Sequence, residues 1–448
     1  MHLPETYESL ILRARSRKAP GVGAACLFLW LAATLATPTW AGEQAAVELP
    51  EPLRPLAEVL DDPRAVSGLT ALQDATQGTV ELLADIAAIV SPSGEELARA
   101  ERVAAEMRRI GLADVRVDAS PNAVGRIPGR SGRAMVFIST LDDLPTVAEH
   151  QRAADGPPRV VGDRLVGPGT NTSSITAAML AAARAYLATG IEPEHDLVFA
   201  AVAQEETGLV GMTTVYEAYR DRAVAFIDIL GDGQSVTYGG LGIHWWRVVG
   251  EGPPGHSLGG GLPNVNQGLA RAVDRIFDLA AEFQDPDTGT VVNIAMLQSG
   301  SVFNHKPAEG WFSLDLRSLE ADILDAVEAA VERLLEEVAA DTGIGLAMEP
   351  FLLTPGGQLP GARDSGLVRM ASAIAGHLGF EATLSNAGSS NMNVAVAGGT
   401  PAIGLGGSRG GDRGQPSEWA DIPAMMRAAE HVLLLALTMA GEGNDQTR

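Results

Sequence analysis

The 448-residue sequence predicts an α/β protein in which a parallel or mixed sheet is covered by helices and a smaller, ferredoxin-like α+β domain is inserted. Two observations predict this fold. Short apolar runs bounded by Gly and Pro alternate with helical patterns in the first half of the chain and again after Ser365. Between these regions the order changes to β-α-β-β-α-β, which is typical of a split βαβ unit. Both ends of the chain are therefore expected to build one domain.

The larger domain is expected over residues 67–243 and 352–442. Its first helical pattern lies near Leu72 to Ile89, and two helices precede the first strand. Strands and helices then alternate over Met135–Ser139, Ser173–Leu187, Leu197–Ala203, Val210–Tyr219 and Ala225–Ile229. The second part adds a helix, a strand and a short helix, followed by a strand and a closing helix at Pro401–Leu405 and Pro423–Ala440.

The inserted domain is expected over residues 244–351, and its pattern changes near Gly239. Four strands and two helices are predicted there. In chain order they are the strand His244–Val249, the helix Asn266–Phe283, the strands Val291–Leu297 and Gly310–Arg317, the helix Ala321–Ala339 and the strand Gly345–Phe351.

Residues 1–41 are expected to be a signal peptide. A basic segment from Arg13 to Lys18 precedes an uncharged run over 21–36, which is too short to span a bilayer comfortably. With cleavage after Ala41, the mature protein is expected in the periplasm or outside the cell, with no membrane attachment; an anchor that is never cut is the alternative. Residues 42–66, rich in Glu, Pro and Ala, are expected to be a tether.

Composition excludes two classes of function. The formal net charge of −24 repels polyanions, so nucleic acid is not expected as a partner. Cys26 is the only cysteine, which excludes a disulfide framework and a thiolate metal cluster.

Acidic residues follow several of the predicted strands. In an open parallel sheet, ligands bind at the carboxyl ends of the strands, so these turns are the candidate site. Paired carboxylates from neighbouring strands would form a dinuclear metal site if His were added, but no His occurs at these turns. The turns contain Asp142-Asp143, residues 167–172, Glu205-Glu206, Asp228 and residues 406–419.

The order of these segments resembles the co-catalytic zinc metallopeptidase family that includes acetylornithine deacetylase, succinyl-diaminopimelate desuccinylase, glutamate carboxypeptidase, aminoacylase and the tripeptidases. The resemblance covers nearly all of residues 70–440. It implies the fold described above, a pair of zinc ions and a homodimer formed by the inserted domain. The matching segments are residues 139–145, 167–172, 204–208, 255–257, 304, 315–317, 388–393 and 414–419.

The resemblance also assigns roles to residues of the central site. Asp142 matches the residue that orients a His ligand, Glu205 matches the general base, and Glu206 and Asp228 each match a ligand to one metal. The three remaining ligand positions are occupied by Thr140, Thr172 and Gly414 in place of His, Asp and His. Because zinc needs three or four N, O or S ligands, two-zinc catalysis is expected to be lost, and the cofactor is expected to be absent or a weakly bound divalent metal such as Mg²⁺ or Ca²⁺.

Peripheral positions match the family more fully. His256 matches the His that a partner subunit directs at the substrate carbonyl, and Asn304 and Arg317 match groups that hold the substrate carboxylate. Asn391, in the matching segment 388–393, is a further candidate for substrate binding.

Three functions stay open at this point. The first is a non-catalytic or altered family member that binds a peptide or an N-acyl amino acid. The second is an active hydrolase of the same compounds that uses unusual ligands with Glu205 as the base, and the third is a structural dimer without a ligand. If Glu205 and Glu206 have no functional role, they form a solvated acidic turn. If His256 has none, it is an ordinary loop residue.

Overall fold

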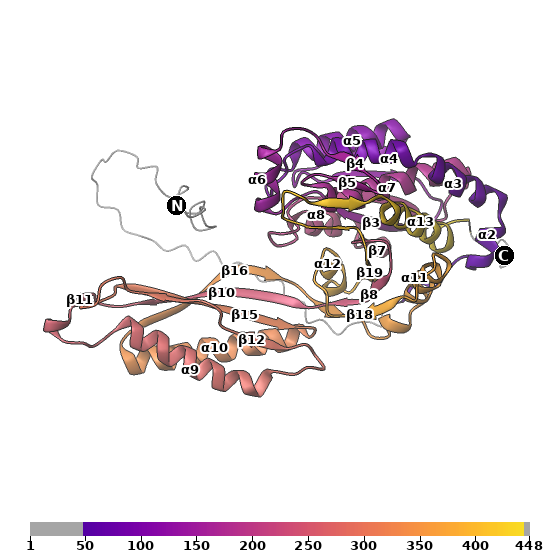
Figure 1. The fold of residues 1–448 in the computed structure, drawn as a ribbon. Helices are drawn as coiled ribbons and strands as arrows, with labels where there is room; N and C mark the ends of the chain where they lie inside the picture. The colour runs from indigo at the N-terminus through magenta and orange to yellow at the C-terminus, as the bar shows by residue number, and fades with distance from the viewer. Residues whose placement is uncertain (1–47, 443–448) are drawn as a thin grey trace, which may run out of the picture. The chain divides into compact units, whose positions relative to one another are not determined.

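The computed structural model describes residues 48–442 (Figure 1). The expected signal peptide over residues 1–41, together with Cys26, lies outside this range. The described chain forms an α/β fold with two principal sheets, one of eight strands and one of five. The predicted fold class is confirmed.

The larger sheet is mixed. Its central strands β6, β3, β7 and β19 run parallel, whereas β1 and β2 at one edge, and the pairing of β19 with β8, are antiparallel. Every residue of β3 and β6 is buried, because helices cover both faces of the sheet. The strand order is β1 (Ala113–Val117), β2 (Ala123–Ile127), β6 (Asp196–Val202), β3 (Ala134–Thr140), β7 (Ala223–Ile229), β19 (Ala402–Gly406), β8 (Ser235–Thr237) and β18 (Thr383–Ser385).

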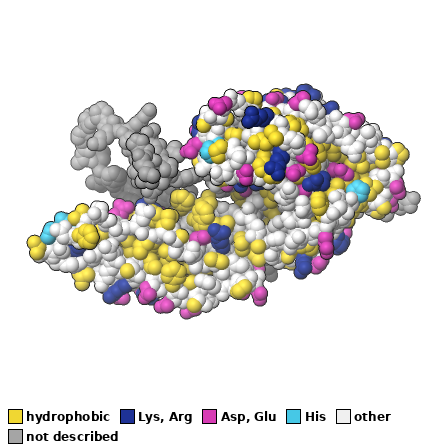
Figure 2. Space-filling model, viewed as in Figure 1, with side chains coloured by type: hydrophobic (Ala, Val, Ile, Leu, Met, Phe, Trp, Pro, Cys, Tyr) yellow, Lys and Arg dark blue, Asp and Glu magenta, His cyan; other side chains and the backbone are white. Residues whose placement is uncertain are grey.

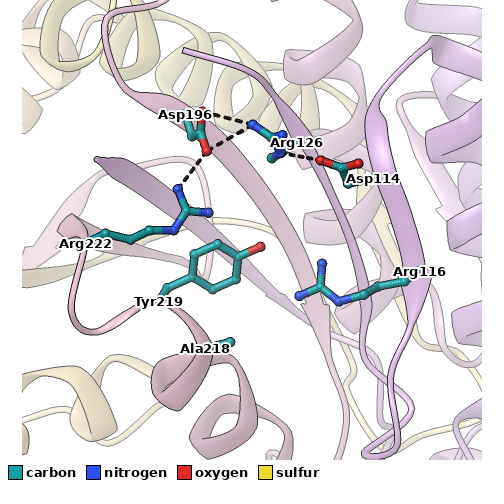
Figure 3. A pocket seen from close by; sticks show the side chains of 7 residues that line it. All are labelled: Asp114, Arg116, Arg126, Asp196, Ala218, Tyr219 and Arg222. Carbon is teal, nitrogen blue, oxygen red and sulfur yellow. Dashed lines mark hydrogen bonds and ion pairs between the residues drawn. The ribbon is translucent and has the colours of Figure 1, made fainter. Parts of the chain in front are cut away.

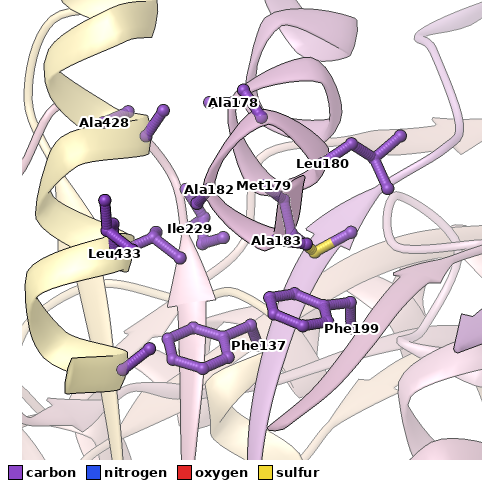
Figure 4. Packing of buried hydrophobic residues seen from close by; sticks show 14 of the residues in the cluster. Phe137, Ala178, Met179, Leu180, Ala182, Ala183, Phe199, Ile229, Ala428 and Leu433 are labelled. Atoms are coloured by element: carbon purple, nitrogen blue, oxygen red, sulfur yellow. The ribbon is translucent and has the colours of Figure 1, made fainter. Parts of the chain in front are cut away.

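Alternating side chains of the sheet enter two separate cores. Phe137 of β3 stacks on Phe199 of β6 with ring centroids 5.5 Å apart, on the face covered by helices α7 (Thr170–Thr189) and α13 (Ile422–Met439) (Figure 4). Ile138, one residue later, packs on the other face against α8 (Val210–Tyr219) and α12 (Met392–Ala397). α13 is long and apolar enough to cross a membrane, but most of it is buried in this core.

The N-terminal region differs from the expected tether. The expected tether over 42–66 includes helix α2 (Leu56–Asp61) and the beginning of α3 (Pro63–Asp74). Asp62 caps α3 by accepting a hydrogen bond from the Arg64 amide at 2.9 Å, and a proline is well tolerated at the first helical position. The pattern from Leu72 to Ile89 is divided at Ala75 between α3 and α4 (Thr76–Ala87).

The inserted region forms a five-stranded antiparallel sheet with its own core. Its path is β12 (Val291–Asn293), β15 (Glu309–Ser318), β10 (Gly242–Glu251) and β16 (Gly345–Thr354), the ferredoxin-like order, and helices α9 (Val265–Phe283) and α10 (Ala321–Thr342) cover one face (Figure 1). The expected single strand Val291–Leu297 is two short strands, β12 and β13 (Leu297–Ser299). Between them the amides of Ala295 and Met296 donate to the Ser313 hydroxyl, which interrupts regular pairing.

Short elements connect these layers. A small sheet in the order β20-β21-β5-β4 joins the loop after β19 to the segment before α7, and this loop carries part of the site described below. The remaining elements are α5 (Leu97–Ile110), α6 (Pro145–Ala153), β4 (Arg159–Val161), β5 (Arg164–Val166), β9 (Gly239–Gly240), β11 (Gly255–His256), β14 (His305–Lys306), β17 (Gly357–Gln358), α11 (Gly366–His377), β20 (Gly410–Gly411), β21 (Trp419–Asp421) and the 3-10 turns Ser257–Gly259 and Ala362–Asp364.

Candidate functional site

The central candidate residues lie at the carboxyl ends of β3, β6 and β7. Thr140 is the last residue of β3, Glu205 and Glu206 follow β6, and Asp228 is the penultimate residue of β7. The charges of Glu206, Asp142 and Asp228 all act on Glu205, so the structure brings these four carboxyl groups into one neighbourhood.

Asp142 fixes the acidic turn after β6. Its carboxylate accepts hydrogen bonds from the Glu205 amide at 2.9 Å, the Glu206 amide at 3.1 Å and the Ser93 hydroxyl at 2.6 Å. The turn opens with Gln204 in the left-handed region at φ 55°, where a non-glycine residue is uncommon. Asp142 is fully buried and therefore positions the backbone of both glutamates.

Glu96 is a second buried anchor of this turn that the sequence analysis missed. Its carboxylate accepts hydrogen bonds from the Gln204 amide at 3.0 Å and from the Gly94 amide at 2.8 Å. Burial raises the pKa of Glu96, and the two amides oppose that rise.

Glu205 and Glu206 have different environments. Burial, followed by the charges of Glu206, Asp142 and Asp228, raises the pKa of Glu205 to about 8. A raised pKa favours the protonated form of this carboxyl group, and only its ionised form can take a proton from water. Glu206 forms an ion pair with Arg413, whose guanidinium Nη2 donates to Oε1.

Arg409 and Arg413 are functional candidates that the sequence analysis missed. Both lie in the loop from β19 to β21, and the charge of Arg409 interacts with Arg413, Glu205 and Glu206. Burial, followed by the charge of Arg413, lowers the pKa of Arg409. These two residues are the only cationic ones within residues 406–419. Positive side chains are unexpected in a turn that should bind metal cations, and this could have identified them from the sequence.

Asp228 and Asn391 form the buried floor of the site. The Met392 amide donates to the Asp228 carboxylate at 3.2 Å, and burial raises the pKa of Asp228 to about 6 against hydrogen bonds from Ser390, Met392 and Asn391. Asn391 Nδ2 donates to the Thr140 hydroxyl at 3.2 Å. The structure thus joins two of the predicted positions directly, Thr140 and Asn391.

Glu418, which had no role in the sequence analysis, links the segment just before Thr172 to Gly414. The buried Glu418 carboxylate accepts hydrogen bonds from the amides of Gly169 and Asn171, each at 3.0 Å, and from the Gly414 amide at 3.1 Å. Within residues 48–442 the buried Thr172 hydroxyl has no hydrogen-bond partner. Gly414 adopts φ 81°, a conformation that favours glycine.

Of the three predicted residues of the inserted region, His256 and Asn304 lie together and Arg317 lies apart. Asn304 Nδ2 lies 2.9 Å from His256 Nε2, and both side chains are exposed beside the antiparallel pair of β11 and β14. Arg317 lies near the other end of β15, about 26 Å from the first residue of that strand at ~3.3 Å per residue. Its guanidinium pairs with Asp315 at 3.0 Å.

The donor set for a metal is sparse throughout the described chain. No group of three or more His, Cys, Asp or Glu side chains within residues 48–442 is arranged to hold a metal ion. At the five predicted ligand positions, two carboxylates, two hydroxyl groups and a glycine are present.

Comparisons with known proteins relate the whole arrangement to peptidases. The family model described as Peptidase family M20/M25/M40 matches residues 137–438. No curated protein sequence matches the chain. Solved structures also resemble its fold, among them the following three. The aminopeptidase PepT from Bacillus cereus aligns with a TM-score of 0.67 at 18% identity, covering 80% of this chain and 97% of its own. A tripeptidase from Staphylococcus aureus gives 0.66 at 18% identity over 80% and 97%. A dinuclear metal-binding peptidase from Bacillus subtilis gives 0.60 at 16% identity over 82% and 98%.

Proposed function

Because the chain belongs to the peptidase family M20/M25/M40, we propose that it is an exported member that binds a peptide or an N-acyl amino acid and has lost the usual two-zinc hydrolysis. The ion pair between Arg413 and Glu206 carries this proposal. Glu206 is one of only two carboxylates at the five ligand positions, and a guanidinium already neutralises it.

The residues present do not fit a pair of divalent metals. A metal ion at Glu206 would have to displace Arg413 and would meet the neutral hydroxyl of Thr172 where a bridging carboxylate is expected. Two cations about 3.5–4 Å apart need such a shared negative charge. In our proposal, Arg409 and Arg413 instead supply the positive charge that balances the carboxylates.

Carboxylate recognition by these arginines supports a binding role. Arg409 makes no hydrogen bond through its guanidinium to any residue of the described range, so its donors are available to a ligand. A guanidinium presents a planar fork of donors that matches a carboxylate. The protonated Glu205 would donate a further hydrogen bond at neutral pH.

Metal analysis tests this proposal. After dialysis against micromolar zinc, we expect the mature protein to hold less than one tightly bound zinc per chain and to hydrolyse neither dipeptides nor N-acetyl amino acids. Combining Thr140→His, Thr172→Asp and Gly414→His with Arg413→Ala should restore zinc uptake, since it rebuilds the ligand set and frees Glu206. Its stability is checked by thermal unfolding, because a side chain at Gly414 is strained at φ 81°.

The matched control is the same combination with Asp228→Asn, which should take up less zinc. Two tightly held zinc ions in the unaltered protein, or turnover abolished both by a chelator and by Glu205→Gln, would establish instead an active hydrolase with unusual ligands. Calorimetry with N-acetyl amino acids and dipeptides separates the binding function from a purely structural dimer. We expect binding that Arg409→Gln weakens about tenfold, as for loss of one charged hydrogen bond.

Export is part of the proposal and has its own test. A basic segment followed by a short apolar run is typical of a cleaved signal, so the mature chain is expected to begin near Gly42. Mass spectrometry of the protein from its native host would detect this form. An intact Met1 as the major species would contradict it.

A further inference from the structure

An open hollow of about 590 Å³ lies at the amino ends of the parallel strands β6 and β7, whereas the site described above lies at their carboxyl ends (Figure 3). Asp196 is the first residue of β6, and Arg222 directly precedes β7, so both lie at the amino ends of these parallel strands. Glu205 and Asp228 lie at or near the carboxyl ends of the same strands. The hollow is therefore separate from the cluster of Asp142, Glu205, Glu206 and Asp228, which we call the peptidase-type centre.

Asp196 holds two guanidinium groups at this hollow. Its carboxylate accepts hydrogen bonds from Arg222 Nη1 at 2.7 Å, from Arg126 Nη1 at 3.2 Å to each oxygen, and from the Gly129 amide at 2.7 Å. Asp114 Oδ2 accepts from Arg126 Nε at 2.6 Å. Both carboxylates are thus engaged, whereas Arg126 Nη2 and Arg222 Nη2 have no hydrogen-bond acceptor among residues 48–442.

Arg116 adds an unpaired cation to the same hollow. It lies on the edge strand β1, where a bulge interrupts pairing with β2 and Asp114 takes φ 53°. Asp114 and Arg116 are both exposed on one side of the strand. Arg116 forms no ion pair or hydrogen bond through its side chain with another described residue, and its guanidinium extends toward the hydroxyl end of Tyr219 (Figure 3).

The charge balance of the hollow is opposite in sign to that of the chain. Three guanidinium groups meet two carboxylates there, whereas the protein carries a formal net charge of −24. Two of the guanidinium groups are held in place by Asp196, so little conformational freedom is lost when they bind a ligand. Donors that reach the space from β1, β2 and the end of α8 suit an anion with acceptor oxygens in several directions.

We propose that this hollow binds a tetrahedral oxyanion, the phosphate group of a small phosphorylated molecule or inorganic phosphate. Arg116 supplies the free charge, and the remaining N–H groups of Arg126 and Arg222 complete the cradle. The Tyr219 hydroxyl is a further donor. This site does not depend on the function proposed for the peptidase-type centre.

Isothermal titration calorimetry on the full mature chain, with chloride used to keep the ionic strength constant, tests this site. Inorganic phosphate and glycerol 3-phosphate are titrated separately, and tighter binding of one identifies the source of the phosphate group. Arg116→Gln should weaken binding at least tenfold, as expected for the loss of a charged hydrogen bond. Its melting temperature should stay unchanged because Arg116 has no partner to lose, and Arg116→Lys should restore part of the affinity.

Arg333→Gln is the matched control, since Arg333 is also exposed and has no ion pair within residues 48–442. It should bind phosphate as the unaltered protein does. Absence of binding at millimolar phosphate, or equal affinity in Arg116→Gln, would overturn the proposal. Affinity that is lost in Arg413→Gln but kept in Arg116→Gln would also overturn it, because the phosphate would then occupy the peptidase-type centre.

Discussion

At the scale of single residues, Arg409 and Arg413 place positive charge beside the acidic residues Glu205 and Glu206. Four carboxyl groups gathered without a counter-charge would repel one another, and a protein can relieve this with a metal, with protons or with basic side chains. Here the raised pKa of Glu205 and the cationic Arg413 both act to relieve this repulsion. If the proposed loss of the metals is correct, these two features replace the positive charge that the metals would supply.

A buried histidine makes the protein sensitive to acid. His431 on α13 is fully buried, and burial lowers its pKa to about 4, although the Asp232 and Ala371 carbonyl groups and the Asp232 charge oppose this. The Asp232 carboxylate is itself paired with Arg427 at 2.9 Å. The unfolded chain binds a proton at His431 near pH 6.5, whereas the folded chain does so only near pH 4. Stability should therefore fall as the pH drops from 6.5 to 4.

The variant His431→Leu should lose less stability over this range. The expected difference is on the order of 3 kcal/mol in the free energy of unfolding, from about 1.4 kcal/mol per pKa unit. Denaturant titrations at pH 7 and pH 4.5 measure it. His377→Leu, at an exposed position, is the control. An equal acid sensitivity of the protein and of His431→Leu would show that other groups cause it.

At the scale of elements, helix α5 is joined to the turn after β3 by one buried ion pair. Arg99 Nη2 donates to the Asp143 carboxylate at 2.6 Å, and both side chains are almost completely buried. Arg99 Nη1 also donates to the Leu141 carbonyl at 2.7 Å. This pair fixes the segment that carries Asp142, and through it the acidic turn after β6.

Replacing Arg99 with Met should destabilise the protein by about 3–5 kcal/mol, because Asp143 would remain buried without its cation. Gln151, at 3.1 Å from the same oxygen, is the only other side chain of the described range that donates to this carboxylate. Arg102→Met on the same helix is the control. Arg102 pairs with the exposed Asp85 and with the buried Glu106 at 3.3 Å, but Glu106 keeps its second pair with Arg109, so this substitution should cost only about 1 kcal/mol. Chemical denaturation compares the two. Similar losses would contradict a special role for the buried pair.

The elements differ in how well the sequence predicts them. The helix Val210–Tyr219 is confirmed at both ends, and the buried strands β3 and β6 are placed within one residue, because long apolar runs leave little choice of structure. The three-residue strand β4 was missed because all of it is exposed, so it lacks the apolar run that marks a buried strand, although it forms a hairpin with the nearby β5. The pattern predicts where Glu206 lies but not its pairing with Arg413, because that partner is 207 residues away in the sequence.

At the scale of the whole molecule, the inserted region presents apolar surface at the end that carries β11. Leu258 is 92% exposed, and Leu262, Val302 and Phe303 are also exposed. In Figure 2 hydrophobic and His side chains lie together at this end. His256 and Asn304 are in the same place, distant from Arg317 along the sheet. We therefore expect their predicted role in ligand binding to depend on a second chain.

We expect the mature protein to be a dimer at micromolar concentration, with His256 directed at the cleft of the partner subunit. An isologous interface would give both subunits the same contact. Light scattering measures the assembly, and His256→Ala should weaken binding of an N-acetyl amino acid without changing the mass. Val66→Asp, at an exposed position of α3, is the control and should do neither. A monomer would remove the proposed role of His256.

Asp142 and Glu418 hold their loops by accepting hydrogen bonds from backbone amides, whatever side chains face the centre. Mutations of the facing side chains therefore leave these supports in place, so a facing side chain could be exchanged for another without the loops collapsing. Because these supports do not depend on the facing side chains, those side chains can change during evolution while the loops keep their structure. A lineage can pass through inactive intermediates that still fold, and the same loops remain ready to acquire a different chemistry.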